Sequence, residues 1–289
     1  MSDRPVVLSL GRLYCDLIFT DLPRLPTMGT EVYAGGFGVH AGGGAFITAA
    51  HLAALGHPSV LAAMLPPQPF GGLLSEDLAR AGLDLDLCRP QPAGDEPQVT
   101  VALVGTGDRA FVTRRSGPAF PPLKVCDLTA IGATHVHIGE LATLIERPDI
   151  IDVARDAGAT ISLDCSWDDG LVAADIAAVL GRVDLFLPNE AEVHHLDDIG
   201  VASALFPLTA IKQGAEGATV LVEGERIHLP AEPVTVVDTT GAGDAFNAGF
   251  VSAWLSGAPP EACLRAGNAQ GARAIAGRGG FHAGGKGPR

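Results

Sequence analysis

Four consecutive residues, Gly241-Ala242-Gly243-Asp244, combine a backbone suited to anions with a carboxylate. They follow a short β-branched run, residues 233–237, that predicts a buried strand. They precede a proline-free apolar stretch, residues 245–255, that predicts a helix. The two glycines lack a Cβ, so an anion can approach the backbone closely, and the free N–H groups at a helix start carry partial positive charge. The sequence therefore predicts a phosphate site where this helix begins.

Asp244 adds a group that phosphate binding alone does not need, because a carboxylate repels a phosphate. It is well placed to take a proton from a hydroxyl group that then attacks the phosphate. The alternative is that Asp244 only stabilises the helix dipole, a contribution of roughly 0.3–1 kcal/mol. The residue types thus indicate phosphoryl transfer to an alcohol, or simple helix capping.

The run from Asp238 to Phe250 resembles the C-terminal signature of the ribokinase-like (PfkB) family of carbohydrate kinases, and every position of that pattern is met. The resemblance implies an ATP-dependent kinase that transfers the γ-phosphate to a hydroxyl group of a sugar or sugar-like small molecule. It implies that Asp244 is the catalytic base. It also implies that Gly241, Ala242 and Gly243 form the anion hole.

Four more residues match positions that contact the sugar in this family. Asp16 matches an aspartate that hydrogen-bonds the sugar hydroxyls. Gly42 and Gly43 open a predicted helix and resemble the N-terminal signature, in which a Gly-Gly pair lets the substrate approach the backbone. Glu140 matches another position near the substrate. Ile47 stands where the family usually carries asparagine, which leaves the substrate class open.

Asn189 and Glu192 match the family's N-x-x-E motif. The resemblance implies that Asn189 faces the phosphates of ATP and that Glu192 helps to hold Mg²⁺ through water. Oxygen ligands and retained waters are what Mg²⁺ prefers. The same pair also suits a helix start, with an asparagine cap and a first-turn glutamate. Both roles can hold together.

The resemblance also implies the remaining nucleotide and cation contacts. Gly214 and Gly217 lie on a turn that packs the ribose and adenine, and Asn268 matches a residue that borders the adenine. Asp238 and Thr240 match a monovalent-cation site, for an ion such as K⁺, that several members contain.

Two further features leave alternatives open. Lys212 stands where the family commonly shows a small or apolar residue, and it either meets a phosphate or points to solvent. His135 and His137 alternate with apolar residues on a predicted strand. Since no third ligand is nearby, hydrogen-bonded core histidines are favoured over a metal site.

Strand and helix patterns alternate along the second half of the chain, which predicts a parallel sheet covered by helices on both faces. Ligands bind outside the carboxyl ends of such strands. We expect an α/β fold, a three-layer α/β/α sandwich with a mostly parallel central sheet, and the resemblance adds a small β-sheet lid. The expected core comprises residues 1–11, 37–94 and 118–289, and the expected lid comprises residues 12–36 and 95–117.

Composition excludes several classes of function. The formal net charge of −14 argues against a nucleic-acid partner, which needs a basic surface. The sequence contains no apolar run long enough to span a membrane and no signal peptide, so we expect a cytoplasmic enzyme. Five scattered cysteines without CxxC spacing indicate reduced thiols.

Two rival functions stay open at this stage. One is a nucleoside kinase of the adenosine kinase type, and the other is a sugar-binding regulator that has lost catalysis. An intact Asp244 argues against the regulator. We also expect a homodimer formed through the lid.

Overall fold

The computed structural model describes residues 4–92, 94–105, 109–201, 206–277 and 280–281. Its helices are α1 (Gly44–Ala54), α2 (Phe70–Ala81), α3 (Val125–Ile131), α4 (Leu141–Glu146), α5 (Asp149–Asp156), α6 (Ala173–Leu180), α7 (Glu190–Asp198), α8 (Ala242–Leu255) and α9 (Pro260–Ile275), with a 3₁₀ turn, η2 (Gly214–Glu216). Its strands are β1 (Val6–Leu10), β2 (Tyr14–Leu22), β3 (Gly36–Gly42), β4 (Ser59–Ala62), β5 (Met64–Leu65), β6 (Arg89–Pro90), β7 (Val99–Gly105), β8 (Arg109–Arg114), β9 (Ala133–Ile138), β10 (Thr160–Asp164), β11 (Leu185–Leu187), β12 (Leu208–Lys212), β13 (Ala218–Val222) and β14 (Glu225–Leu229).

The central sheet has the strand order β14-β13-β12-β11-β10-β9-β1-β4 among the described residues. All pairs from β4 to β12 are parallel, and β13 and β14 add an antiparallel hairpin at one edge. Leu8 in β1 pairs with Val60 on one side and Val136 on the other, and all three side chains are buried. Strands buried on both faces are expected to be apolar throughout, as these are.

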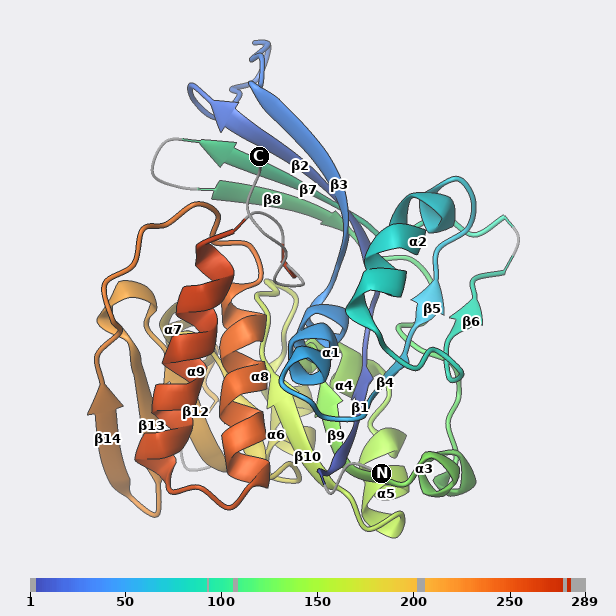
Figure 1. Cartoon of the computed structure of the whole chain (residues 1–289), viewed down its shortest axis with the longest axis vertical. Coiled ribbons are helices and arrows are strands. Elements are labelled where there is room, and N and C mark those ends of the chain that lie inside the picture. The colour runs from blue at the N-terminus through green and yellow to red at the C-terminus, as the bar shows by residue number, and fades with distance from the viewer. Residues whose placement is uncertain (1–3, 93, 106–108, 202–205, 278–279, 282–289) are drawn as a thin grey trace.

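Helices cover both faces of this sheet and confirm the predicted three layers. On one face, α3 to α7 contribute buried side chains such as Leu128, Ile176 and Leu196 to one apolar cluster. On the other face, α1, α8 and α9 contribute side chains such as Phe250 and Leu264 to a second cluster. Figure 1 shows α8 and α9 side by side in front of the sheet.

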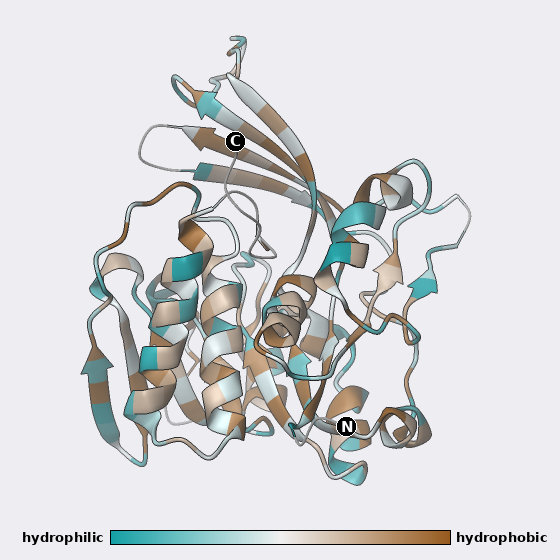
Figure 2. Ribbon diagram, viewed as in Figure 1, coloured by the Kyte–Doolittle hydropathy of each residue, from teal (hydrophilic) through white to brown (hydrophobic). Residues whose placement is uncertain are grey.

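A separate small sheet with the order β3-β2-β7-β8 rises beyond the central sheet (Figure 1). Its strands carry alternating hydrophobic and polar positions (Figure 2). The whole of β3 pairs with β2 in this sheet, from Gly36 opposite Thr20 to Gly42 opposite Tyr14. The lid expected from the sequence ends at residue 36, and the expected core resumes at residue 37. The small sheet therefore extends to residue 42 at this boundary.

The strand predicted for residues 233–237 does not form, and the prediction is wrong. Val234, Val236 and Val237 are exposed by 39%, 56% and 52%. An apolar β-branched run fits an extended surface segment as well as a buried strand, and periodicity alone does not distinguish them. Hydrogen bonds to the end of α9 hold this segment in place instead of strand pairing. The N–H groups of Val237 and Asp238 donate to the Ile275 carbonyl at 2.8 and 3.3 Å.

The two strand histidines belong to the core, as favoured from the sequence. His135 bonds Thr160 and Ser162 through its two ring nitrogens, both at 2.8 Å, and His137 bonds Ser162 at 2.9 Å. Burial lowers the pKa of His135 to about 3 and that of His137 to about 4, so both are neutral at pH 7. Within the described residues, no group of three or more His, Cys, Asp or Glu side chains could hold a metal ion.

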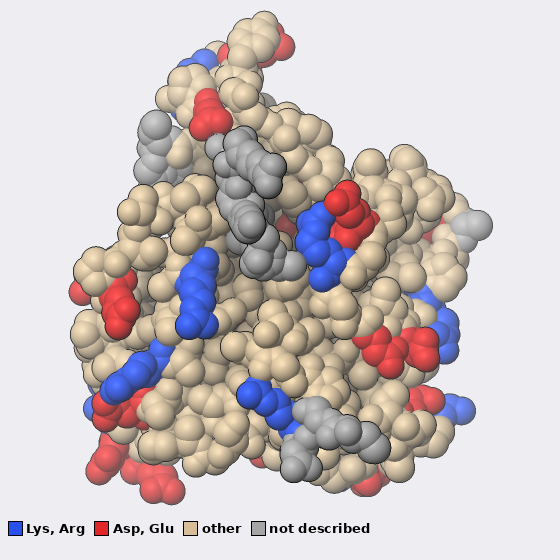
Figure 3. All heavy atoms as spheres, viewed as in Figure 1, with Lys and Arg blue, Asp and Glu red and all other residues tan. Residues whose placement is uncertain are grey.

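On the face drawn in Figure 3, acidic and basic side chains of the described residues are interspersed rather than gathered in one basic area. Among the helices that the structure describes, none combines the length and the apolar character needed to cross a bilayer.

Candidate active site

The residues predicted to form the anion loop lie at the start of α8. Gly241 precedes the helix with φ 72°, a left-handed conformation that favours glycine. A Cβ at this position would lie 2.6 Å from backbone atoms of Gly280, so close packing also requires glycine. The first N–H groups of a helix have no partner within it and can bind an anion; here the Ala242 N–H donates to the Thr239 carbonyl at 3.3 Å.

Asp244 sits in the first turn of α8 and faces the start of α1. A Cβ built on Gly44 would lie 3.1 Å from Asp244 Oδ1, and Thr48 Oγ1 donates to the Asp244 carbonyl at 3.3 Å. The residue is partly accessible to solvent, although protein atoms surround its carboxylate. Burial and then the charge of Asp164 raise the pKa of Asp244 to about 7. A carboxyl group that titrates near neutrality suits a general base.

Asp16 and Gly42 meet on neighbouring strands of the small sheet. A Cβ on Gly42 would lie only 1.9 Å from Asp16 Oδ2, so the carboxylate rests directly against this glycine. Burial and the charge of Asp244 raise the pKa of Asp16 to about 7, while a hydrogen bond with Thr100 opposes the shift. Gly43 has φ 99°, and a Cβ there would lie 2.2 Å from the Arg12 carbonyl oxygen. The substrate residues predicted in this region thus lie together.

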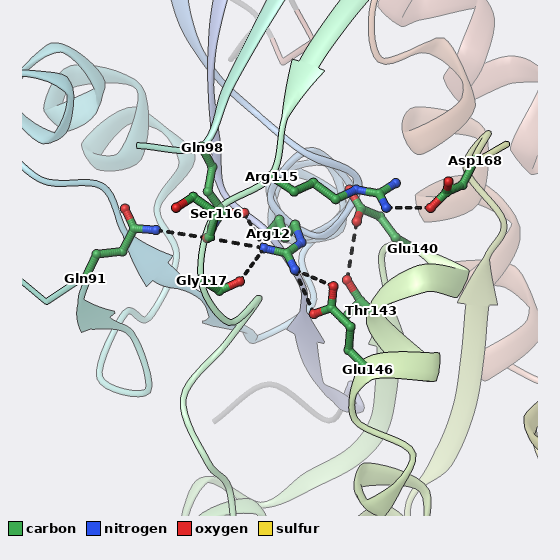
Figure 4. A network of polar contacts seen from close by, with 10 residues as sticks. All are labelled: Arg12, Gln91, Gln98, Arg115, Ser116, Gly117, Glu140, Thr143, Glu146 and Asp168. Carbon is green, nitrogen blue, oxygen red and sulfur yellow. Dashed lines mark hydrogen bonds and ion pairs between the residues drawn. The ribbon is translucent and has the colours of Figure 1, made fainter. Parts of the chain in front are cut away.

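Glu140 belongs to a buried polar network beside these strands (Figure 4). It precedes α4 and accepts a hydrogen bond from Thr143 Oγ1 at 3.3 Å. Burial raises the pKa of Glu140, and the charges of Arg115 and Arg12 oppose that shift. Arg115 points past Glu140 to Asp168, where its Nη1 lies 2.5 Å from Oδ2.

Arg12 occupies the centre of the network in Figure 4. Its guanidinium donates to Gln98 Oε1 at 2.7 Å, to the Gly117 carbonyl at 2.9 Å and to both carboxylate oxygens of Glu146. Sequence analysis missed Arg12 and Arg115, because their partners are far away along the chain and no local pattern signals the pairing.

Asn189 and Glu192 form a capping box at the start of α7. Asn189 Oδ1 accepts from the Glu192 N–H at 2.9 Å, and Glu192 Oε2 accepts from the Asn189 N–H at 2.7 Å. The helix-start role proposed for this pair is therefore confirmed. Glu192 is buried, and burial raises its pKa to about 7, with Lys212 opposing and Asp164 adding to the shift.

Gly217 and Asn268 contact one backbone segment. A Cβ on Gly217 would lie 2.1 Å from the Leu229 carbonyl oxygen, and φ is 97° there. Asn268 Nδ2 donates to the carbonyls of Leu229 and Pro230 at 3.1 and 3.3 Å. Gly214 opens the exposed turn η2 just before Gly217. The three residues predicted to border the nucleotide thus lie around one turn and the end of β14.

Lys212 does not point to solvent, so that alternative is wrong. Its side chain is 13% exposed, and Nζ donates to Asp164 Oδ1 at 2.8 Å and to Asn247 Oδ1 at 3.2 Å. Asn247 Nδ2 in turn donates to Asp164 Oδ2 at 2.8 Å. Asn247 is part of the signature, yet nothing in the sequence indicated this contact.

Asp238 and Thr240 lie in the loop before α8, where Asp238 Oδ1 accepts from the Thr240 N–H at 2.8 Å. Thr240 Oγ1 is buried and has no hydrogen-bond partner among the described residues. A buried oxygen atom without a hydrogen-bond partner is unusual in a folded protein. Such an oxygen atom is a suitable ligand for a cation.

Comparison with known proteins places the chain among kinases. The model of the pfkB family of carbohydrate kinases matches residues 5–282. The ATP-dependent ribose-1-phosphate kinase of Halopiger xanaduensis is 33% identical over 277 residues, which cover 92% of this chain and 90% of that protein. The ribokinase of Arabidopsis thaliana, solved with ribose and ATP, superposes with a TM-score of 0.77 and 25% identity over 96% of this chain and 94% of that chain. The nucleoside kinase of Methanocaldococcus jannaschii shares the fold, with a TM-score of 0.78 and 18% identity over 95% and 93% of the two chains.

Proposed function

Because this chain belongs to the pfkB family of carbohydrate kinases, it is an ATP-using phosphotransferase that acts on a hydroxyl group, and we propose that its acceptor is a sugar or sugar-like small molecule. The observation that carries the proposal is the position of Asp244 in the first turn of α8, directly after the backbone N–H groups of Gly241, Ala242 and Gly243. A carboxyl group with a pKa of about 7 faces Gly44 at the start of α1 there.

In the proposed reaction, Asp244 accepts the proton of the acceptor hydroxyl as its oxygen forms a bond to the γ-phosphorus. The bond between that phosphorus and the β,γ-bridging oxygen breaks, and ADP leaves. The N–H groups of Gly241, Ala242 and Gly243 stabilise the charge on the transferred phosphate. General base catalysis of this kind contributes about 10²–10⁴ in rate, and one lost donor of an anion hole costs roughly 3 kcal/mol.

Asp16 and Glu140 hold the acceptor in this proposal, with Gly42 and Gly43 making room for it. Asp16 rests against Gly42, and the charge of Asp244 reaches both carboxylates. The small sheet acts as the lid, closing over the acceptor so that water does not take the phosphate.

On the nucleotide side, Asn189 faces the phosphates, while Gly214, Gly217 and Asn268 border the ribose and adenine. Their placement around one turn supports this assignment. Glu192 would hold Mg²⁺ through water, because a cation would stabilise the charged form of a buried carboxylate whose pKa burial raises. Mg²⁺, when bound, neutralises charge on the phosphate oxygens.

Asp238 and Thr240 fit a monovalent cation such as K⁺, as part of the same proposal. The support is the buried Thr240 Oγ1, which has no partner among the described residues. An ion there would brace the loop that leads into the anion hole.

A homodimer through the lid completes the proposal. Phe19, Phe37 and Leu103 are register partners and so share one face of the small sheet. They line a hollow of about 510 Å³ together with Tyr33, and Phe37 is 61% exposed. An apolar surface of this kind on a soluble protein marks an interface, and a second copy of the chain is our proposed occupant.

The variant Asp244→Asn tests the catalytic proposal. It should lower ATP turnover by about 10²–10⁴ while ATP binding and the circular dichroism spectrum stay unchanged. The acceptor is to be found by coupled ATP turnover over pentoses, hexoses, sugar phosphates, sugar acids and nucleosides. Near-normal turnover by Asp244→Asn would refute the base assignment, and preference for nucleosides would favour a nucleoside kinase.

A further inference from the structure

Lys212 forms a bridge between three elements beneath the anion loop. The residue ends β12, Asp164 ends β10, and Asn247 lies on α8. The three side chains close a ring of hydrogen bonds, with distances of 2.8, 3.2 and 2.8 Å. Such a ring fixes the lysine ammonium group to the carboxyl edge of the sheet.

This ring lies next to the reacting groups. Asn247 and Asp244 are three residues apart on α8, so they share one face of the helix. A Cβ on Gly243 would lie 3.5 Å from Lys212 Nζ, which puts the ammonium group under the anion loop. A movement of Lys212 would therefore reach both the base and the amides.

Carboxylates surround this one ammonium group. Five charged groups face Asp244: Asp164 of β10, Lys212 of β12, Glu192 of α7, Glu140 before α4 and Asp16 of β2. Four of these five are acids, and Lys212 is the cation among them. Burial alone would lower the pKa of Lys212, but the charges of Asp164, Glu192 and Asp244 and the hydrogen bond to Asp164 together raise it above its ordinary value. The ammonium group thus stays charged, which the site needs if its acids are to ionise.

We propose that Lys212 is a positioning residue for phosphoryl transfer: from its bridge to Asp164 and Asn247, it holds the face of α8 that carries Asp244 and supplies the positive charge that keeps Asp244 in its basic form. The inference rests on the proposed function of Asp244 as the base. Its nearest competitor is direct contact between Lys212 and the phosphates of ATP, and the experiment below separates the two.

The test measures kcat/KM against pH, because its acid limb reports the ionisation of the base in the free enzyme. Lys212→Met should move the midpoint of the acid limb upward by about one pH unit or more, so that activity falls about fivefold or more at pH 7 and largely returns by pH 9. Asp164→Asn should move the limb downward, because the charge of Asp164 raises the pKa of Asp244. The double variant should bring the midpoint back to within about half a unit of the wild type.

Two control variants bracket this series. Lys212→Arg keeps the charge and should keep the limb near its original position. Lys124→Met removes the same charge from an exposed residue before α3, and it should leave the profile unchanged. The double variant also guards against misfolding, since it does not leave the Asp164 carboxylate without its ion-pair partner.

Three outcomes would overturn the proposal. One is a Lys212→Met enzyme that loses activity equally at every pH, which would indicate a purely structural role. Another is an unmoved acid limb with a large loss of ATP affinity, which would indicate direct phosphate binding. The third is a double variant no closer to the wild type than the single one. Failure of the proposed function would look different, because Asp244→Asn would then retain turnover whatever Lys212 does.

Discussion

Replacing Gly42 by alanine should damage acceptor binding by moving Asp16. In the structure, a Cβ on Gly42 would lie 1.9, 2.2 and 2.4 Å from Asp16 Oδ2, Cγ and Oδ1. Ordinary contact with a Cβ begins near 3.4 Å. The nearest oxygen must therefore retreat by about 1.5 Å, the difference between 3.4 and 1.9 Å.

A displacement of this size is enough to break a hydrogen bond to an acceptor hydroxyl, since the donor–acceptor distances of such bonds vary by only about 0.5 Å. A hydrogen bond to a charged group is worth about 1.5–3 kcal/mol, which corresponds to about 10- to 150-fold. We expect that loss in kcat/KM for the acceptor. The KM for ATP should change little, because Gly42 lies on the small sheet, and Asn189 and Gly217 lie elsewhere.

The assay is steady-state ATP turnover with the acceptor varied, run for Gly42→Ala, Asp16→Ala and the double variant. If Gly42 acts through Asp16, then alanine at position 42 should cost almost nothing further once Asp16 is gone. Full additivity of the two losses would refute the reasoning, and so would a Gly42→Ala enzyme with an unchanged KM for the acceptor.

Three further predictions follow from the same geometry. Since burial raises the pKa of Asp244 from 3.8 to about 7, kcat/KM at pH 6 should be about a tenth of its plateau. The native state also binds the proton of Asp244 more tightly than the unfolded state does. Asp244→Asn should therefore raise the melting temperature at pH 8 but not at pH 4, as calorimetry would show. Gly241→Ala should lower both melting temperature and turnover, because φ is 72° and its Cβ would lie 2.6 Å from Gly280, whereas Gly243→Ala should fold normally with its Cβ at 3.5 Å from Lys212 Nζ. Phe37→Glu should convert the lid dimer to a monomer in light scattering, while Val172→Glu, equally exposed but outside the lid, should not.

Much of the architecture was predictable because it depends on local pattern. The alternation of strands and helices in the second half of the chain was predicted, since strands such as β10 (Thr160–Asp164) are short and apolar. The helix of the signature was also predicted, but the strand before it was not, because Val234 and Val236 are exposed in an extended segment. A sequence pattern records which residues are apolar. It does not record which segment a neighbouring strand will pair with.

The site shows the same division between local and distant information. Asp244 and Glu192 could be singled out because their motifs are continuous in sequence. Arg12 could not, since its carboxylate partner Glu146 lies on another element, 134 residues further along the chain. Lys212 was noticed only as an unusual residue, and its partner Asp164 lies 48 residues away.

The glycines show how a correct prediction can rest on an incomplete reason. In sequence, Gly241 and Gly243 are equivalent, because each removes a Cβ from a loop that approaches phosphate. In the structure, Gly241 is fixed by its left-handed backbone and by Gly280, while a Cβ on Gly243 would turn toward Lys212. Space for the anion therefore does not depend equally on both positions.

The electrostatics of the site follow from the shared position of its acids rather than from any one residue. The charge of Asp244 raises the pKa of Asp16, and the charge of Asp164 raises the pKa of Asp244. Burial and the charge of Asp164 raise the pKa of Glu192 in the same region. A change in one charge must then shift the ionisation of the others. Conservative removal of any single carboxylate should consequently move the pH profile of turnover as well as its height, which distinguishes this cluster from independent contacts.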